Sequence, residues 1–136
     1  MKLSDDSVEM RRGDGRRAFL RGGVMKVIYV AGPYRAQTEW GLVENIRRAE
    51  EVAIALWKKG WAVICPHKNT AHFGGLCEDH VWLDGGFEIL KRCDAVCLVI
   101  GWEKSEGTQQ EIVVAKKHGL TIFYSVRQVP YETNHA

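Results

Sequence analysis

The residues from Gly101 to Glu111 carry the clearest chemical signal in the sequence, because an apolar run ends there in a polar, glycine-containing turn. The Ser105-Glu-Gly107 turn precedes a helix, and the backbone N–H groups at a helix start attract anions such as phosphate. Glu111 follows at the expected start of the helix, where the helix dipole favours an ionised carboxylate. A carboxylate held beside an anion site suggests covalent attack on a sugar carbon.

Two other strand ends are expected to meet this turn. The first strand supplies the phenol of Tyr29 and then the guanidinium of Arg35, and the second is followed by the imidazole of His67. The carboxyl ends of parallel strands lie at one edge of a sheet, and ligands bind in the crevice outside that edge. The sequence therefore predicts one site built from three separate segments.

The apolar pattern predicts an α/β fold. Short apolar runs bounded by polar residues favour buried strands at 27–31, 61–65, 94–100 and 121–124. Helical spacing or flanking signals favour helices at about 38–59, 81–92 and 111–118, the first with Leu42, Ile46, Ala49, Ala53 and Leu56 on its inner face. This alternation predicts a three-layer α/β/α sandwich with a mostly parallel, flavodoxin-like or Rossmann-like sheet of four to five strands.

Composition limits the function classes. The chain has 136 residues and a formal net charge of +2. Residues 1–24 hold six basic and four acidic side chains, which leaves thirteen of each sign in residues 25–136. We therefore expect a loosely attached basic tail at 1–24, a single domain at 25–136, and no binding of polymeric nucleic acid. No apolar run is long enough for a membrane span, so a cytoplasmic protein is expected.

The connection at 67–80 is longer than compact folds usually need, and such loops often act as lids. Zinc-type ligands are crowded around it, namely Cys65, His67, His72, Cys77 and His80. Their spacing matches no standard zinc pattern, so a zinc site is kept as an alternative and no metal is predicted. The dinucleotide fingerprint and the P-loop are both missing, so neither NAD(P) nor ATP is the expected ligand.

Three segments, Tyr29-Val-Ala-Gly32, the Asp94-Ala-Val strand and Ser105-x-Gly107-x-x-x-Glu111, resemble the nucleoside 2-deoxyribosyltransferase superfamily. Within it, the chain is similar to small phage and bacterial proteins whose function is mostly unassigned. The resemblance covers nearly all of residues 26–124. It implies a Rossmann-like sheet, a homodimer or higher oligomer, and cofactor-free cleavage of the N-glycosidic bond of deoxynucleosides or their 5′-monophosphates.

The resemblance also implies roles for individual residues. Glu111 matches the nucleophile that forms a glycosyl ester, and Tyr29 matches the tyrosine that holds it. Ser105 and Arg35 match the phosphate-binding residues of the members that hydrolyse monophosphates. The remaining expected substrate-binding residues are Gly32, Tyr34, His67 and Gly107. The predicted substrate is accordingly a small nucleotide or nucleoside.

One position departs from the superfamily pattern. The aspartate expected eight residues before Asp94 is replaced by Gly86. We expect Asp84 to assist the leaving base in its place, with Glu88 as a weaker substitute. Without an acid, the alternative is a catalytically weak or inactive module that binds or senses nucleotides.

The structural alternatives stay open at this point. Glu111 can serve only to complement a helix dipole, and Tyr29 can be a core residue with a satisfied hydroxyl. Trp82 and Trp102 either pack in the core or stack on a base. A structure distinguishes these readings because it shows which side chains meet.

Overall fold

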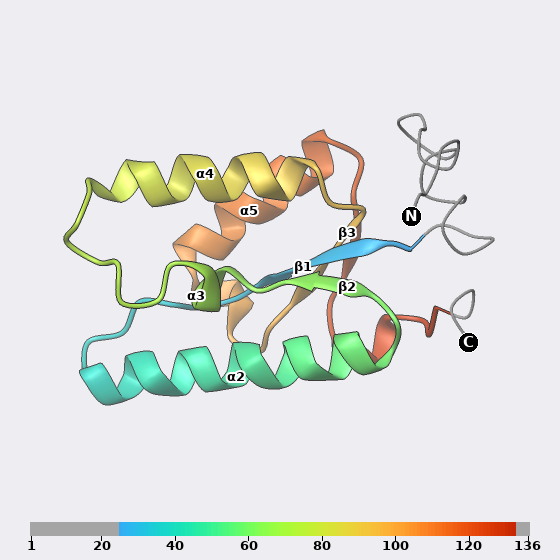
Figure 1. The fold of residues 1–136 in the computed structure, drawn as a ribbon, viewed down its shortest axis with the longest axis horizontal. Coiled ribbons are helices and arrows are strands. Elements are labelled where there is room, and N and C mark those ends of the chain that lie inside the picture. Colours follow the sequence, from blue (N-terminus) through green and yellow to red (C-terminus); the bar gives the residue numbers. More distant parts are fainter. Residues whose placement is uncertain (1–24, 133–136) are drawn as a thin grey trace, which may run out of the picture.

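The computed structural model describes residues 25–132, in which four strands form one parallel sheet (Figure 1). The strands are β1 (Val27–Ala31), β2 (Ala62–Ile64), β3 (Ala95–Leu98) and β4 (Thr121–Phe123), in the order β2-β1-β3-β4. All three neighbouring pairs are parallel. The chain leaves β1 toward one edge of the sheet and later returns to build the other edge. The boundary between β1 and β3 is therefore the topological switch point, where ligands bind in sheets of this kind.

Helices cover both faces of the sheet (Figure 1). The long helices are α2 (Glu39–Lys58) on one face, and α4 (Asp79–Lys91) and α5 (Glu106–Lys117) together on the other. Alternation along β1 places Ile28 and Val30 in the core beneath α2, and Tyr29 and Ala31 in the core beneath α4 and α5. The predicted three-layer α/β/α sandwich is confirmed.

Helix α2 forms as the sequence predicts. The Thr38 side chain caps its start by accepting a 2.9 Å hydrogen bond from the backbone N–H of Gly41. Gly60 follows its last turn with a positive φ of 94°, a conformation that glycine adopts without strain. Ala49, Ala53 and Leu56 are buried, while the other two predicted inner-face residues are partly exposed.

Helix starts differ most from the prediction. Helix α5 begins at Glu106, five residues before the expected Glu111, because Ser105 caps it and its apolar spacing becomes visible only later. Helix α4 begins at Asp79 rather than 81. A helix of four residues, α3 (Pro66–Asn69), lies in a segment predicted as an irregular connection. It is too short to show a helical period, although proline at a first helical position is a recognised start signal.

Two short 3₁₀ helices complete the described fold, η1 (Trp102–Lys104) and η2 (Val126–Gln128). The segment after η2 returns to α2 and β2, where the Lys59 ammonium donates to the carbonyls of Val126 and Val129, and the Trp61 indole donates to Pro130. None of the helices between residues 25 and 132 is long and apolar enough to cross a bilayer. The predicted tail of residues 1–24 lies outside the described residues.

Candidate active site

Tyr29 and Glu111 meet beside the switch point. Tyr29 lies in the middle of β1 and is 1% exposed, with its side chain on the α4 and α5 face of the sheet. Helix α5 follows β3 and carries Glu111 on its second turn. The Tyr29 hydroxyl donates a 2.7 Å hydrogen bond to Oε2 of Glu111. The structure therefore brings together the predicted nucleophile and the tyrosine predicted to hold it.

Burial controls the charge of this pair. Desolvation raises the pKa of Glu111 to about 7, and the hydrogen bond from Tyr29 lowers it in part. The pKa of Tyr29 is also raised, first by its burial and then by the neighbouring Glu111. The expectation that the helix start keeps Glu111 ionised is wrong, because α5 begins five residues earlier and the dipole acts within the first turn. Near neutral pH, Glu111 is present in both charged and neutral forms.

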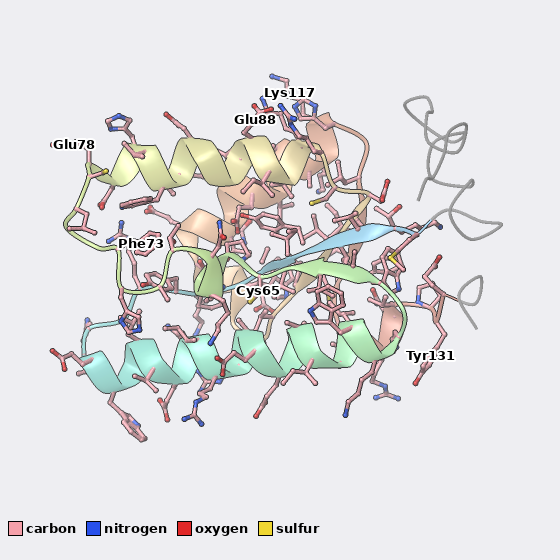
Figure 2. The ribbon with its side chains drawn as sticks, in the orientation of Figure 1. Cys65, Phe73, Glu78, Glu88, Lys117 and Tyr131 are labelled. Carbon is pink, nitrogen blue, oxygen red and sulfur yellow. The ribbon has the colours of Figure 1, made fainter. Side chains whose placement is uncertain are left out.

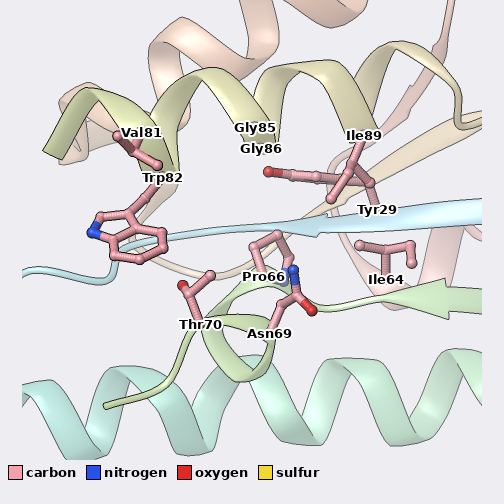
Figure 3. Close-up of a pocket in the computed structure, with 10 residues that line it drawn as sticks. All are labelled: Tyr29, Ile64, Pro66, Asn69, Thr70, Val81, Trp82, Gly85, Gly86 and Ile89. Carbon is pink, nitrogen blue, oxygen red and sulfur yellow. The ribbon is translucent and has the colours of Figure 1, made fainter. Parts of the chain in front are cut away.

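A pocket opens beside the Tyr29 hydroxyl, between α4, α3 and the edge of the sheet (Figure 3). Its volume is about 130 Å³, and its lining residues are Tyr29, Ile64, Pro66, Asn69, Thr70, Val81, Trp82, Gly85, Gly86 and Ile89. Trp82, Gly85, Gly86 and Ile89 share one side of α4 at spacings of three, four and seven residues. A Cβ atom on Gly86 would lie 3.5 Å from the Tyr29 hydroxyl. The glycine pair therefore leaves the space in front of this hydroxyl open.

Trp82 contributes an aromatic face to the pocket (Figure 3). Its ring centroid lies 5.8 Å from that of Phe73 on the segment between α3 and α4. The indole nitrogen is buried and makes no hydrogen bond within the described protein. Of the two tryptophans considered for base stacking, Trp82 lines the pocket, whereas Trp102 packs on Tyr124 with ring centroids 5.6 Å apart.

Ser105 is the N-cap of α5. Its Oγ accepts a 3.2 Å hydrogen bond from the backbone N–H of Thr108 and a 2.9 Å hydrogen bond from the Thr108 hydroxyl. These two bonds use the acceptor capacity of the serine oxygen and leave its proton for another acceptor. Gly107 is exposed in the first turn, with open space where a side chain would lie. The arrangement is a helix start that can bind an anion.

Arg35 and His67 have partners within the protein. The Arg35 guanidinium forms a 2.9 Å ion pair with Asp79 at the start of α4, and both side chains are exposed. The Nε2 atom of His67 lies 2.8 Å from the carbonyl oxygen of Pro33, and the ring meets Tyr34 edge-on at 5.7 Å between centroids. Burial lowers the pKa of His67. The prediction that His67 lines the site does not fit, because its ring is buried and is not among the residues that line the pocket.

Gly32 has a packing role. A Cβ atom at this position would lie 2.4 Å from the Cβ of Val99, closer than two carbon atoms can approach. The glycine therefore allows the chain after β1 to pass close to the chain after β3. This close approach brings the two strand ends of the site together.

Asp84 and Glu88 lie outside the pocket. Helix α4 is continuous from 79 to 91, so Asp84 lies about 200° around the helix from Gly86. Asp84 is exposed and is not among the residues that line the pocket. Glu88 points away from the sheet (Figure 2) and is paired with Lys91 and Arg92. The prediction that a shifted helix start brings Asp84 to the base is wrong, because the helix is regular through the glycines.

The pocket wall includes residues to which the sequence assigns no individual role. Asn69 and Thr70 come from the end of α3, a helix that was not predicted, and Ile89 comes from the inner side of α4. The spacing of Trp82, Gly85, Gly86 and Ile89 was a signal that could have identified the α4 wall. Within residues 25–132, no group of three or more His, Cys, Asp or Glu side chains is arranged to hold a metal ion, so the zinc alternative gains no support.

Comparison with known proteins adds a fold and a family. The structure is similar to that of a 2-deoxyribosyltransferase from the psychrotolerant bacterium Bacillus psychrosaccharolyticus, with a TM-score of 0.56 and 21% sequence identity over 71% of this chain and 69% of that one. The fold implied by the resemblance is thereby confirmed. A search of curated proteins gives no significant match. The family model described as "Domain of unknown function (DUF4406)" matches residues 26–124, so the chain belongs to the DUF4406 family.

Proposed function

We propose that the protein cleaves, or transfers a sugar at, the N-glycosidic bond of a nucleoside or deoxynucleoside 5′-monophosphate, with Glu111 as the covalent nucleophile. The observation that carries this proposal is the 2.7 Å hydrogen bond between Tyr29 and Glu111 beside the pocket. The structurally similar protein is a 2-deoxyribosyltransferase described as a biocatalyst for nucleoside synthesis, which supports the same general reaction class.

The pair has the features that covalent catalysis needs. The Tyr29 hydroxyl binds Oε2 and thereby orients the carboxylate, which leaves Oε1 to attack C1′ of the sugar. The C1′–N bond then breaks, its electrons leave with the base, and a glycosyl ester of Glu111 remains. Water or a second base attacks C1′ and regenerates the carboxylate. Two displacements at the same carbon retain its configuration.

The start of α5 supports a phosphate as part of the substrate. Ser105 retains a proton to donate, and the N–H groups of Glu106 and Gly107 belong to the first turn of α5, where backbone donors have no partner within the helix. Arg35 is the proposed cationic contact. Its ion pair with Asp79 is exposed, and such pairs contribute little free energy, so a phosphate can replace Asp79 as its partner.

Release of free base from a panel of nucleosides and their 5′-monophosphates, followed by chromatography, tests the proposal. Glu111→Gln should abolish release, because an amide is not a nucleophile. Glu44→Gln, on the exposed side of α2, is the matched control and should retain full activity. Release by Glu111→Gln at the rate of the unmodified protein would rule out the covalent mechanism.

A second function follows from the lack of a carboxyl group among the described residues that line the pocket. A nucleotide-binding or nucleotide-sensing module needs the pocket and the phosphate site but no acid. Calorimetric binding of a nucleotide that is recovered intact after long incubation would favour this module. The homodimer or higher oligomer stays a prediction, which light scattering on the purified protein tests.

A further inference from the structure

Among residues 25–132, no side chain that lines the pocket is an acid able to protonate a departing base. The described residues that line it carry no carboxyl, imidazole or amino group. Tyr29 is the one ionisable side chain among them, and its proton is held in the hydrogen bond to Glu111. Asp84 and Glu88 lie on other sides of α4, and His67 is buried against the loop after β1. Proton transfer to the leaving group is typically worth about 10²–10⁴-fold in rate, and this pocket does not provide it.

The need for a proton depends on the charge of the base. A neutral base leaves as an anion unless it is protonated as the bond breaks. A base whose glycosidic nitrogen belongs to a cationic aromatic ring leaves as a neutral molecule, because the electron pair of the C1′–N bond cancels its positive charge. A site with a nucleophile and no acid is therefore matched to a cationic leaving group.

The shape and polarity of the pocket agree with such a group. The cavity of about 130 Å³ is smaller than the roughly 300–1,000 Å³ of typical ligand pockets, so it suits one flat ring system rather than a whole nucleotide. The rings of Trp82 and Tyr29 border it (Figure 3), and aromatic faces attract cations. None of the lining residues in the described part of the chain is positively charged, and the Glu111 carboxyl group lies one hydrogen bond beyond the Tyr29 hydroxyl.

We propose that the pocket accepts N-glycosides whose base is a cationic aromatic ring, that is, pyridinium or N-alkylated purine nucleotides. This inference rests on the glycosidic function proposed above. In the first step the Glu111 carboxylate bonds to C1′, the C1′–N bond breaks, and the neutral base departs without a proton. In the second step water adds to C1′, the ester bond breaks, and one proton is released to solvent. Each turnover thus yields a sugar phosphate, a neutral base and one proton.

The test uses substrate pairs that differ in the charge of the base. The purine pair is 7-methylguanosine 5′-monophosphate and guanosine 5′-monophosphate. The single-ring pair is nicotinamide mononucleotide and its reduced form, in which the nicotinamide ring carries no charge. Base release is measured for the full chain, and proton release is followed with a pH indicator. We expect the preference for the cationic member to be at least as large as that of the uncatalysed reaction, with Glu111→Gln inactive on both.

A substitution that introduces a carboxyl group at position 86 provides a second test. Gly86→Asp places a carboxyl group near the Tyr29 hydroxyl, and Gly86→Asn is the matched control of the same size without an acidic proton. Either side chain narrows the pocket for every substrate, so the readout is the ratio of neutral to cationic turnover, which should be at least about tenfold higher in Gly86→Asp than in Gly86→Asn. The measurements on the unmodified chain stand by themselves if either variant fails to fold.

The outcomes separate this inference from the function on which it rests. Equal turnover of charged and neutral counterparts would overturn the substrate class and leave the glycosidic function in place. No release of base from any member would overturn the glycosidic function and, with it, this inference. Selective, Glu111-dependent release from the cationic members, with one proton per turnover, is the expected result.

Discussion

The Tyr29 hydroxyl donates a 2.7 Å hydrogen bond to Oε2 of Glu111 across 82 positions of sequence. The bond ties the middle of β1 to the second turn of α5, and it lies at the boundary where the direction of sheet construction reverses. It also opposes the effect of burial on the carboxyl group. The charge of Glu111 therefore depends on a residue from the first strand of the described fold.

The hydrogen bond from Tyr29 stabilises the charged form of Glu111. Tyr29→Phe removes this bond and should therefore raise the pKa of Glu111 above its value of about 7. Base release at neutral pH should fall, and the acidic limb of the pH–rate profile should move to higher pH. Carbon-13 NMR of labelled glutamate measures the pKa directly. Tyr124→Phe, which changes an exposed tyrosine, is the control. An unchanged pKa in Tyr29→Phe would show that the bond does not set the charge of Glu111.

Glu111 should also make stability depend on pH. Its folded pKa of about 7 lies above the ordinary value of 4.5, so between these values the folded state binds the proton more strongly. The stability conferred by the protonated carboxyl is complete below about pH 4.5 and is lost as the pH rises to about 7. Glu111→Gln has no such carboxyl group. Its free energy of unfolding should therefore rise relative to that of the unmodified protein, by up to roughly 3 kcal/mol, as the pH increases over that range.

Urea unfolding of both proteins at several pH values checks this prediction. His67 acts in the opposite direction, because burial lowers its pKa and its contribution is lost as the pH falls below its ordinary value of 6.5. It is present in both proteins, so the difference between them isolates Glu111. A difference that stays constant from pH 4.5 to 7 would contradict the raised pKa.

Ser105 variants separate helix capping from phosphate binding. Ser105→Ala removes the cap and should lower the free energy of unfolding by about 1 kcal/mol. Ser105→Asp retains a good capping residue but places a negative charge at the proposed phosphate site. It should keep near-normal stability and lower kcat/KM for 5′-monophosphates by at least about tenfold, while nucleosides are little affected. Equal losses on nucleosides and monophosphates would argue against a phosphate contact at Ser105.

Gly32→Ala should destabilise the fold, because its Cβ would overlap Val99. Overpacking of this kind costs about 1–3 kcal/mol, which urea unfolding detects. Gly74→Ala is the matched control, since a Cβ there meets no atom within 4 Å. If both variants lose the same stability, the close approach of the two strand ends is not the reason for glycine at position 32.

The sequence predicts the layers of this fold because buried parallel strands have a simple signature. Runs such as Val27–Ala31 are apolar, short and bounded by polar residues. Every predicted strand is present, the first with the predicted limits and the other three with shorter ones. Helix starts are harder to place, since capping by Ser105 takes effect several residues before an apolar period can be seen. Helix α3 has one turn and therefore no period at all.

The candidate site was predictable where it depends on topology. The meeting of strand ends predicts that the segments holding Tyr29 and Glu111 converge, and the superfamily resemblance implies that the two side chains pair. The geometry brings them together. The placements of Asp84 and His67 depend on helix phase and on burial, which local sequence does not specify. To predict the pocket wall formed by α4, one needs the phase of the helix and the face of it that packs on the sheet.

The glycine pair of α4 has a consequence for motion. Gly85 and Gly86 each lower helix stability by about 1 kcal/mol relative to alanine, and they lie in the middle of the helix that forms one wall of the pocket. Local opening starts where helix stability is lowest, so backbone amides of α4 should exchange with deuterium sooner than those of α2. The same residues that leave room for a ligand thus weaken this wall, and faster exchange in the middle of α4 than in the middle of α2 would measure its opening.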